Sequence, residues 1–96
     1  MEITLDYAKA ERQAGTLEQC ANDMMMQSTE VSNIIAEVRS AWQGDTANTY
    51  IRKLEVLENE LKINADKCSR DAADFRARVN SIKRADEAAS NVSVIT

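Results

Sequence analysis

The chain has 96 residues, no proline, two glycines, four aromatic residues and 44% hydrophobic residues, a composition typical of one small domain built from long helices. Its net charge is −4, with three basic and seven acidic side chains in residues 1–44 and nine of each in residues 45–96, so no basic stripe favours nucleic acid or anionic membranes. With no histidine and only two separated cysteines, we expect no metal, cofactor or catalytic residues and no enzyme activity.

The N-terminal stretch MEITLDYAKAERQ lacks the basic and apolar regions of a cleaved signal peptide. No window approaches the ~18 apolar residues of a membrane span, so we expect neither the general secretory route nor stable membrane insertion. A first helix is predicted over about residues 4–42, with Thr4 as its N-cap and Asp6 placed favourably against the helix dipole.

The chain changes direction in SAWQGDTANTY, residues 40–50, which contains the only tryptophan. Gly44 can take the left-handed conformation that ends a helix, and Asp45 or Thr46 can cap the next helix, which places a turn at residues 43–45. Trp42 has two interpretations: its ring seals the end of the core, or its edge stays exposed and is recognised by a partner.

A second helix is predicted over about residues 46–89, followed by a short frayed tail at 90–96. Apolar or small residues alternate at spacings of three and four along both helices. If the helices are antiparallel, residues at one level have numbers that add up to about 88 or 89, and the two stripes obey this rule. Their larger members form the expected seam: Leu17, Met24, Val31, Ile35, Val38, Leu54, Leu57, Leu61, Phe75 and Val79.

The predicted fold is therefore all-α, an antiparallel two-helix hairpin that forms one domain over residues 1–96. Two helices leave other apolar side chains uncovered, at Met25, Met26, Ile34, Val56 and Ile63. We expect two hairpins to dimerise into a four-helix bundle that covers them, most simply antiparallel.

Cys20 and Cys68 lie level in this hairpin by the same rule. Two alternatives stay open. If the Cα atoms come within ~4.4–6.8 Å, a disulfide can form across the hairpin in an oxidising environment; if they are farther apart, both are small core residues.

A helical hairpin of this length with Trp-x-Gly at its corner resembles the WXG family, the ESAT-like proteins that bacterial type VII systems secrete. The resemblance covers the chain from ITLDYAKAERQ through SAWQGDTANTY to IKRADEAAS. It implies a small protein that is made in the bacterial cytoplasm, secreted without a cleaved signal peptide, and recognised by the secretion ATPase. It also implies a homodimer or a heterodimer with another WXG-type protein, and a recognition surface that includes Trp42 and Gly44.

The family's export signal also includes a Tyr-x-x-x-Asp/Glu element in the second helix. Here IKRADEA places Ile82 where the resemblance calls for tyrosine, with Asp86 at the acidic position. One helical turn brings these two residues onto one face. Either a partner binds them together, or Ile82 belongs to the seam and Asp86 to the solvated surface. Tyr7 and Glu11 have the same spacing in the first helix, and we interpret that as coincidence.

The leading hypothesis is a non-enzymatic type VII secretion substrate that acts through helix packing. The alternative is an intracellular heterodimeric adaptor that delivers a larger toxin whose N-terminal domain is a related hairpin, because family members without the tyrosine often travel with a partner that has it. The off-seam methionines suit this second role as adaptable contacts, or lie in the dimer core. Membrane disruption after export is disfavoured, because the apolar seam is needed inside the hairpin.

Overall fold

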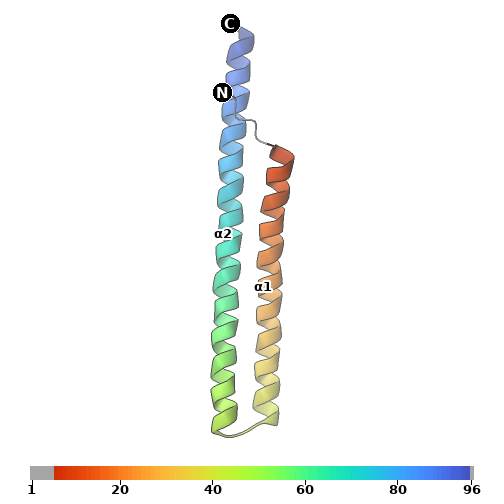
Figure 1. Ribbon diagram of the computed structural model, residues 1–96, viewed down its shortest axis with the longest axis vertical. Helices are drawn as coiled ribbons and strands as arrows, with labels where there is room; N and C mark the ends of the chain where they lie inside the picture. The colour runs from red at the N-terminus through yellow and green to blue at the C-terminus, as the bar shows by residue number, and fades with distance from the viewer. Residues whose placement is uncertain (1–5, 96) are drawn as a thin grey trace.

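The protein is an antiparallel pair of helices that lie side by side along most of their length (Figure 1). The computed structural model describes the backbone of residues 6–95 and the side chains of residues 6–90. Helix α1 spans Tyr7–Ala41 and helix α2 spans Asp45–Ile95, and the molecule measures 79 × 17 × 15 Å. The predicted all-α helical hairpin is confirmed.

The helix ends differ from the predicted ones in three places. Asp6 is the N-cap of α1, its carboxylate accepting the Lys9 N–H at 3.0 Å, whereas Thr4 lies outside the described residues. Helix α2 begins at Asp45, so Asp45 and Thr46 lie in its first turn and do not cap it from outside. The expected tail at 90–96 is wrong as far as Ile95, because the sequence there holds no glycine or proline to end the helix.

The seam near the corner is filled by large side chains. Val31, Ile35 and Ile51 form a buried cluster against which Val38, Leu54 and Leu61 pack. Toward the open end the fully buried apolar positions are alanines, while the larger side chains between them are only half-buried. The buried alanines are Ala10, Ala14, Ala21, Ala65 and Ala72, and the half-buried residues are Leu17, Met24, Phe75 and Val79.

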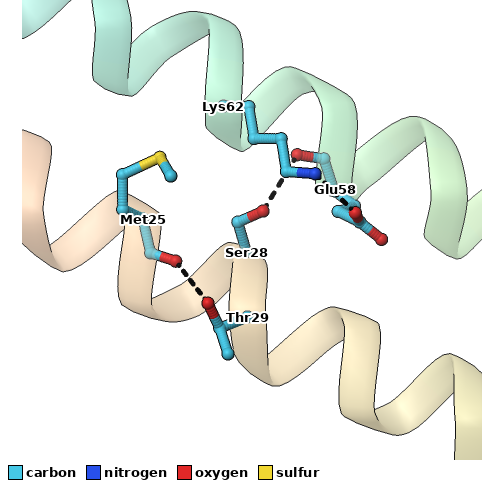
Figure 2. Close-up of polar contacts among 5 residues, drawn as sticks. All are labelled: Met25, Ser28, Thr29, Glu58 and Lys62. Carbon is cyan, nitrogen blue, oxygen red and sulfur yellow. Dashed lines mark hydrogen bonds and ion pairs between the residues drawn. The ribbon is translucent and has the colours of Figure 1, made fainter.

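Leu57 is the one expected seam residue that the hairpin does not cover, with 44% of its surface exposed. The alternation of threes and fours in α2 passes through Glu58, whose backbone faces α1. There the buried Ser28 hydroxyl donates to the Glu58 carbonyl at 3.5 Å, and the Glu58 carboxylate accepts from Lys62 at 2.8 Å (Figure 2). The prediction for Leu57 is wrong because it followed the apolar residue and not the helical period.

Ion pairs also join the two helices. Arg39 contacts Glu55 at 2.9 Å near the corner, and Arg76 contacts Glu11 at 2.9 Å and also Glu18 nearer the open end. Most of these side chains are well exposed to solvent, so we expect each pair to contribute only a fraction of a kcal/mol, on the order of 0.2–1 kcal/mol.

Candidate functional site

The corner is shaped by the backbone of Trp42 and Gly44. Trp42 turns out of α1 with φ −121° and ψ 145°, while its N–H still donates to the Val38 carbonyl at 2.8 Å. Gly44 has φ 104°, and its carbonyl accepts the Asn48 N–H at 3.1 Å in the first turn of α2. The predicted left-handed conformation of Gly44 is confirmed, and it allows the chain to reverse within three residues of Ala41.

The Trp42 ring lies on the surface of the corner, with 55% of the residue exposed. It packs against Tyr50 in the first turns of α2, with ring centroids 6.1 Å apart and planes tilted by 36°. The core nearest the corner is closed instead by Ala47 and Ile51, both of which are buried. Of the two interpretations of Trp42, sealing the core therefore does not describe this ring, and a supported, accessible aromatic surface does.

A hollow of about 530 Å³ opens beside Trp42 at the corner. Its lining includes Trp42, Gly44, the buried Ile51 and charged groups of both helices. The charged and polar members of the lining are Arg39, Gln43, Asn48, Arg52 and Glu55. The hollow therefore combines an exposed aromatic face with charged and polar groups at one end of the hairpin.

Tyr7 and Asp86 form a second polar contact, at the open end of the hairpin. The Tyr7 hydroxyl donates to Asp86 Oδ2 at 2.5 Å, and Lys83 Nζ lies 5.9 Å from the centre of the Tyr7 ring. The hydrogen bond to Asp86, followed by burial and by the negative charges of Asp86 and Glu87, raises the pKa of Tyr7 to about 12. The phenol therefore stays protonated and keeps donating to the carboxylate at neutral pH.

Sequence analysis missed this role of Tyr7. The rule that pairs level residues places Tyr7 opposite Ile82, so the same numbering that aligned the seam contained the signal. Ile82 itself is 44% exposed, because α1 begins at Tyr7 and offers little surface to cover it. The structure thus brings a tyrosine from α1 beside the acidic residue of α2, and leaves the aliphatic side chain at position 82 accessible.

Cys20 and Cys68 are both half-buried free thiols on facing helices. Burial, followed by the charge and the hydrogen bond of the neighbouring Cys20 thiol, raises the pKa of Cys68. The structure therefore brings the two side chains near each other, as the level-residue rule predicted.

Several large apolar side chains are exposed on the shaft of the hairpin. They are Met25, Met26, Ile34, Val56, Leu57 and Ile63, and Leu57 joins the set expected from sequence because the seam does not cover it. Scattered exposed apolar residues are common on soluble proteins. On a narrow two-helix rod with a small core, however, these six side chains mean that much of the large apolar surface stays in contact with water.

No protein-family model, no curated protein and no solved structure matches the chain. Over the part of the chain that the structure describes, neither helix has a stretch apolar enough to cross a membrane.

Proposed function

We propose that this protein is a small, non-enzymatic substrate or partner of a bacterial type VII secretion system, recognised by the secretion ATPase at the corner of its hairpin. The observation that carries the proposal is the exposed Trp42 ring, supported by Tyr50 and positioned by the positive φ of Gly44. An exposed tryptophan at a fixed turn leaves apolar surface in contact with water, which is unfavourable. Binding to a partner removes that surface from water.

The open end gives this proposal a second support. The proposed export element at Ile82 and Asp86 lacks a tyrosine of its own, but the Tyr7 hydroxyl reaches Asp86 from the other helix. A partner that docks on this end meets a phenol, a carboxylate and the exposed Ile82 together. On this proposal the element is assembled across the hairpin and depends on the folded structure.

Dimerisation into a four-helix bundle is part of the same proposal, as a homodimer or with another WXG-type protein. The exposed apolar side chains on the shaft support it, since a partner hairpin would remove them from water. Sedimentation at micromolar concentration tests it: a dimer is expected, and a monomer for the wild type would contradict this part of the proposal.

Export is tested in a bacterium with an active type VII system and in a matched strain without its secretion ATPase. The full-length protein, made in the cytoplasm, is expected in the medium of the first strain alone, with no segment removed. Trp42→Ala is expected to stay in the cells. Gln27→Ala, which removes an exposed side chain away from the corner and outside the apolar set assigned to dimerisation, is the control and is expected to be exported.

Helical circular dichroism establishes that both variants are folded before export is compared. Absence of the wild type from the medium, while other substrates of the same system are exported, would overturn the proposal. Equal export of Trp42→Ala and Gln27→Ala would remove the role assigned to the corner.

A second candidate is an intracellular adaptor that targets a larger toxin with a related helical N-terminal domain. The absence of tyrosine at the exposed position 82 favours it, as does the pair of exposed methionines at 25 and 26. Purification of tagged protein from its own host distinguishes the two: a larger co-purifying toxin with the adaptor retained in cells supports this candidate, while self-association and release into the medium support the first.

A further inference from the structure

Cys20 and Cys68 lie on facing helices in the half of the hairpin where the buried apolar residues are alanines. The two thiols lie near enough for Cys20 to raise the pKa of Cys68, and both are only half-buried. Because Cys20 lies in α1 and Cys68 in α2, a bond between their sulfur atoms would join the two helices.

The neighbouring layers explain why the helices allow this approach. Ala21 follows Cys20 in α1, and Ala65 and Ala72 lie one turn before and after Cys68 in α2; all three are buried. Helix axes lie 8–10 Å apart depending on the side chains at the contact, and alanine favours the shorter separation. A disulfide requires Cα atoms about 4.4–6.8 Å apart, which facing cysteines reach only when neighbouring side chains are small.

We propose that Cys20 and Cys68 are a redox modification site, at which a disulfide oxidant converts the two thiols into a disulfide that clamps the alanine-rich half of the hairpin. In the first step one cysteine thiolate attacks a sulfur atom of the oxidant, forms a mixed disulfide and releases one thiolate of the oxidant. The second cysteine thiolate then attacks the protein sulfur of that mixed disulfide and releases the other thiolate.

The balance of the reaction is two electrons passed to the oxidant disulfide and two protons lost by the cysteine thiols, which the released thiolates or solvent take up. The raised pKa of Cys68 keeps that thiol protonated at neutral pH, which slows its attack on a disulfide sulfur atom. The inference concerns the hairpin alone and does not depend on export.

The proposed disulfide would join the helices in the half of the hairpin where packing between them is weaker. Burial of alanine removes little apolar surface from water, so the layers around Cys20 and Cys68 hold the helices together more weakly than the cluster at Val31, Ile35 and Ile51. A disulfide there closes a long loop that includes the corner, and it reduces the conformational freedom of the unfolded chain.

The test uses the folded full-length protein, oxidised glutathione as the probe, and a control with one thiol moved by a single position. In Cys68→Ser/Ser69→Cys the second thiol moves from the half-buried position 68 to the exposed position 69. Mass spectrometry under non-reducing conditions at low protein concentration is expected to find wild type lighter by two hydrogen atoms, as a single chain. The control is expected to carry glutathione adducts instead.

The same comparison in concentrated urea separates native geometry from chain flexibility, because both proteins are then expected to close at similar rates. The oxidised wild type is expected to melt at a temperature higher by roughly 8 °C or more than the reduced form, and a reducing agent is expected to reverse the shift. Wild type that gives only glutathione adducts or cross-linked dimers in the native state, closes no faster than the control, or melts lower when oxidised would overturn the proposal.

Discussion

Near the corner, large aliphatic side chains from both helices are buried against each other, whereas near the open end the helices meet through alanines, half-buried side chains and polar groups. The first region contains Val31, Ile35 and Ile51; the second contains Ala14 and Ala72. Burial of a large aliphatic side chain contributes about 1.5–3 kcal/mol, several times what the single methyl group of alanine supplies. The stability of the hairpin is therefore concentrated near the corner.

The same difference bears on function. Trp42 is displayed beside the stable region, so its position is fixed by a packed core and a short turn. Tyr7, Ile82 and Asp86 lie at the end where the core is thin, so their arrangement depends on weaker contacts. On the proposed function, a partner meets a rigid corner and an adjustable end.

The largest expected effect is from a cavity in the corner cluster. Ile35→Ala truncates a buried member of this cluster, and we expect a loss of about 2–4 kcal/mol in the free energy of unfolding. Urea denaturation followed by circular dichroism measures it, at one protein concentration because dimerisation would shift the midpoint. The control Ile82→Ala, at an exposed site outside the surface assigned to dimerisation, is expected to cost less than about 1 kcal/mol, and equal losses would contradict the comparison.

The next effect tests whether the open-end half depends on small side chains. Ala72 is fully buried, so Ala72→Leu forces the helices apart and is expected to cost about 1–3 kcal/mol. Ala73→Leu adds the same side chain at the adjacent exposed position and is expected to change stability by less than about 0.5 kcal/mol. If both variants unfold at the same urea concentration, close packing of the alanine layers is not what holds this half.

Much of the fold follows from the sequence, for a physical reason. Alternating spacings of three and four mark one face of a helix, and a glycine between two such faces marks a turn, so both helices and their antiparallel arrangement are predictable. The prediction that Leu57 lies in the seam was wrong because an apolar residue was preferred to Glu58, the position that the helical period requires. There the Ser28 hydroxyl donates to the backbone carbonyl of Glu58. Sequence letters do not reveal a backbone acceptor.

The candidate site was less predictable than the fold. The Trp-x-Gly motif identified the corner, but the exposure of Trp42 follows from its extended backbone and from its contact with Tyr50, which one motif does not encode. The contact between Tyr7 and Asp86 joins residues from the two ends of the described chain. It becomes visible only when the register of the two helices is applied beyond the apolar residues.

The two glycines give a matched pair with opposite expected signs. Gly44 has φ 104°, so Gly44→Ala strains the backbone of the turn, although the added methyl group meets no atom, and is expected to cost about 1–2 kcal/mol. Gly15 lies inside α1 with equal space around it, and Gly15→Ala is expected to stabilise the protein by about 0.5–1 kcal/mol. Urea midpoints of the same sign for both variants would show that the turn does not require its left-handed conformation.

The smallest expected effect on stability, and the most local, is the titration of Tyr7. Its folded pKa of about 12 is above the ordinary value of 10.0, so the neutral phenol is favoured by folding. The stabilisation from its hydrogen bond to Asp86 is therefore fully present below pH 10 and is lost as the pH rises from 10 to 12. In a Tyr50→Phe background, tyrosinate absorbance reports Tyr7 alone, because the chain has only two tyrosines. Adding Asp86→Asn to that background is expected to lower the pKa of Tyr7 toward 10. Circular dichroism establishes that the helices persist in this variant. An unchanged titration would mean that Asp86 does not hold the phenol, and that the open end lacks the contact that distinguishes it from the corner.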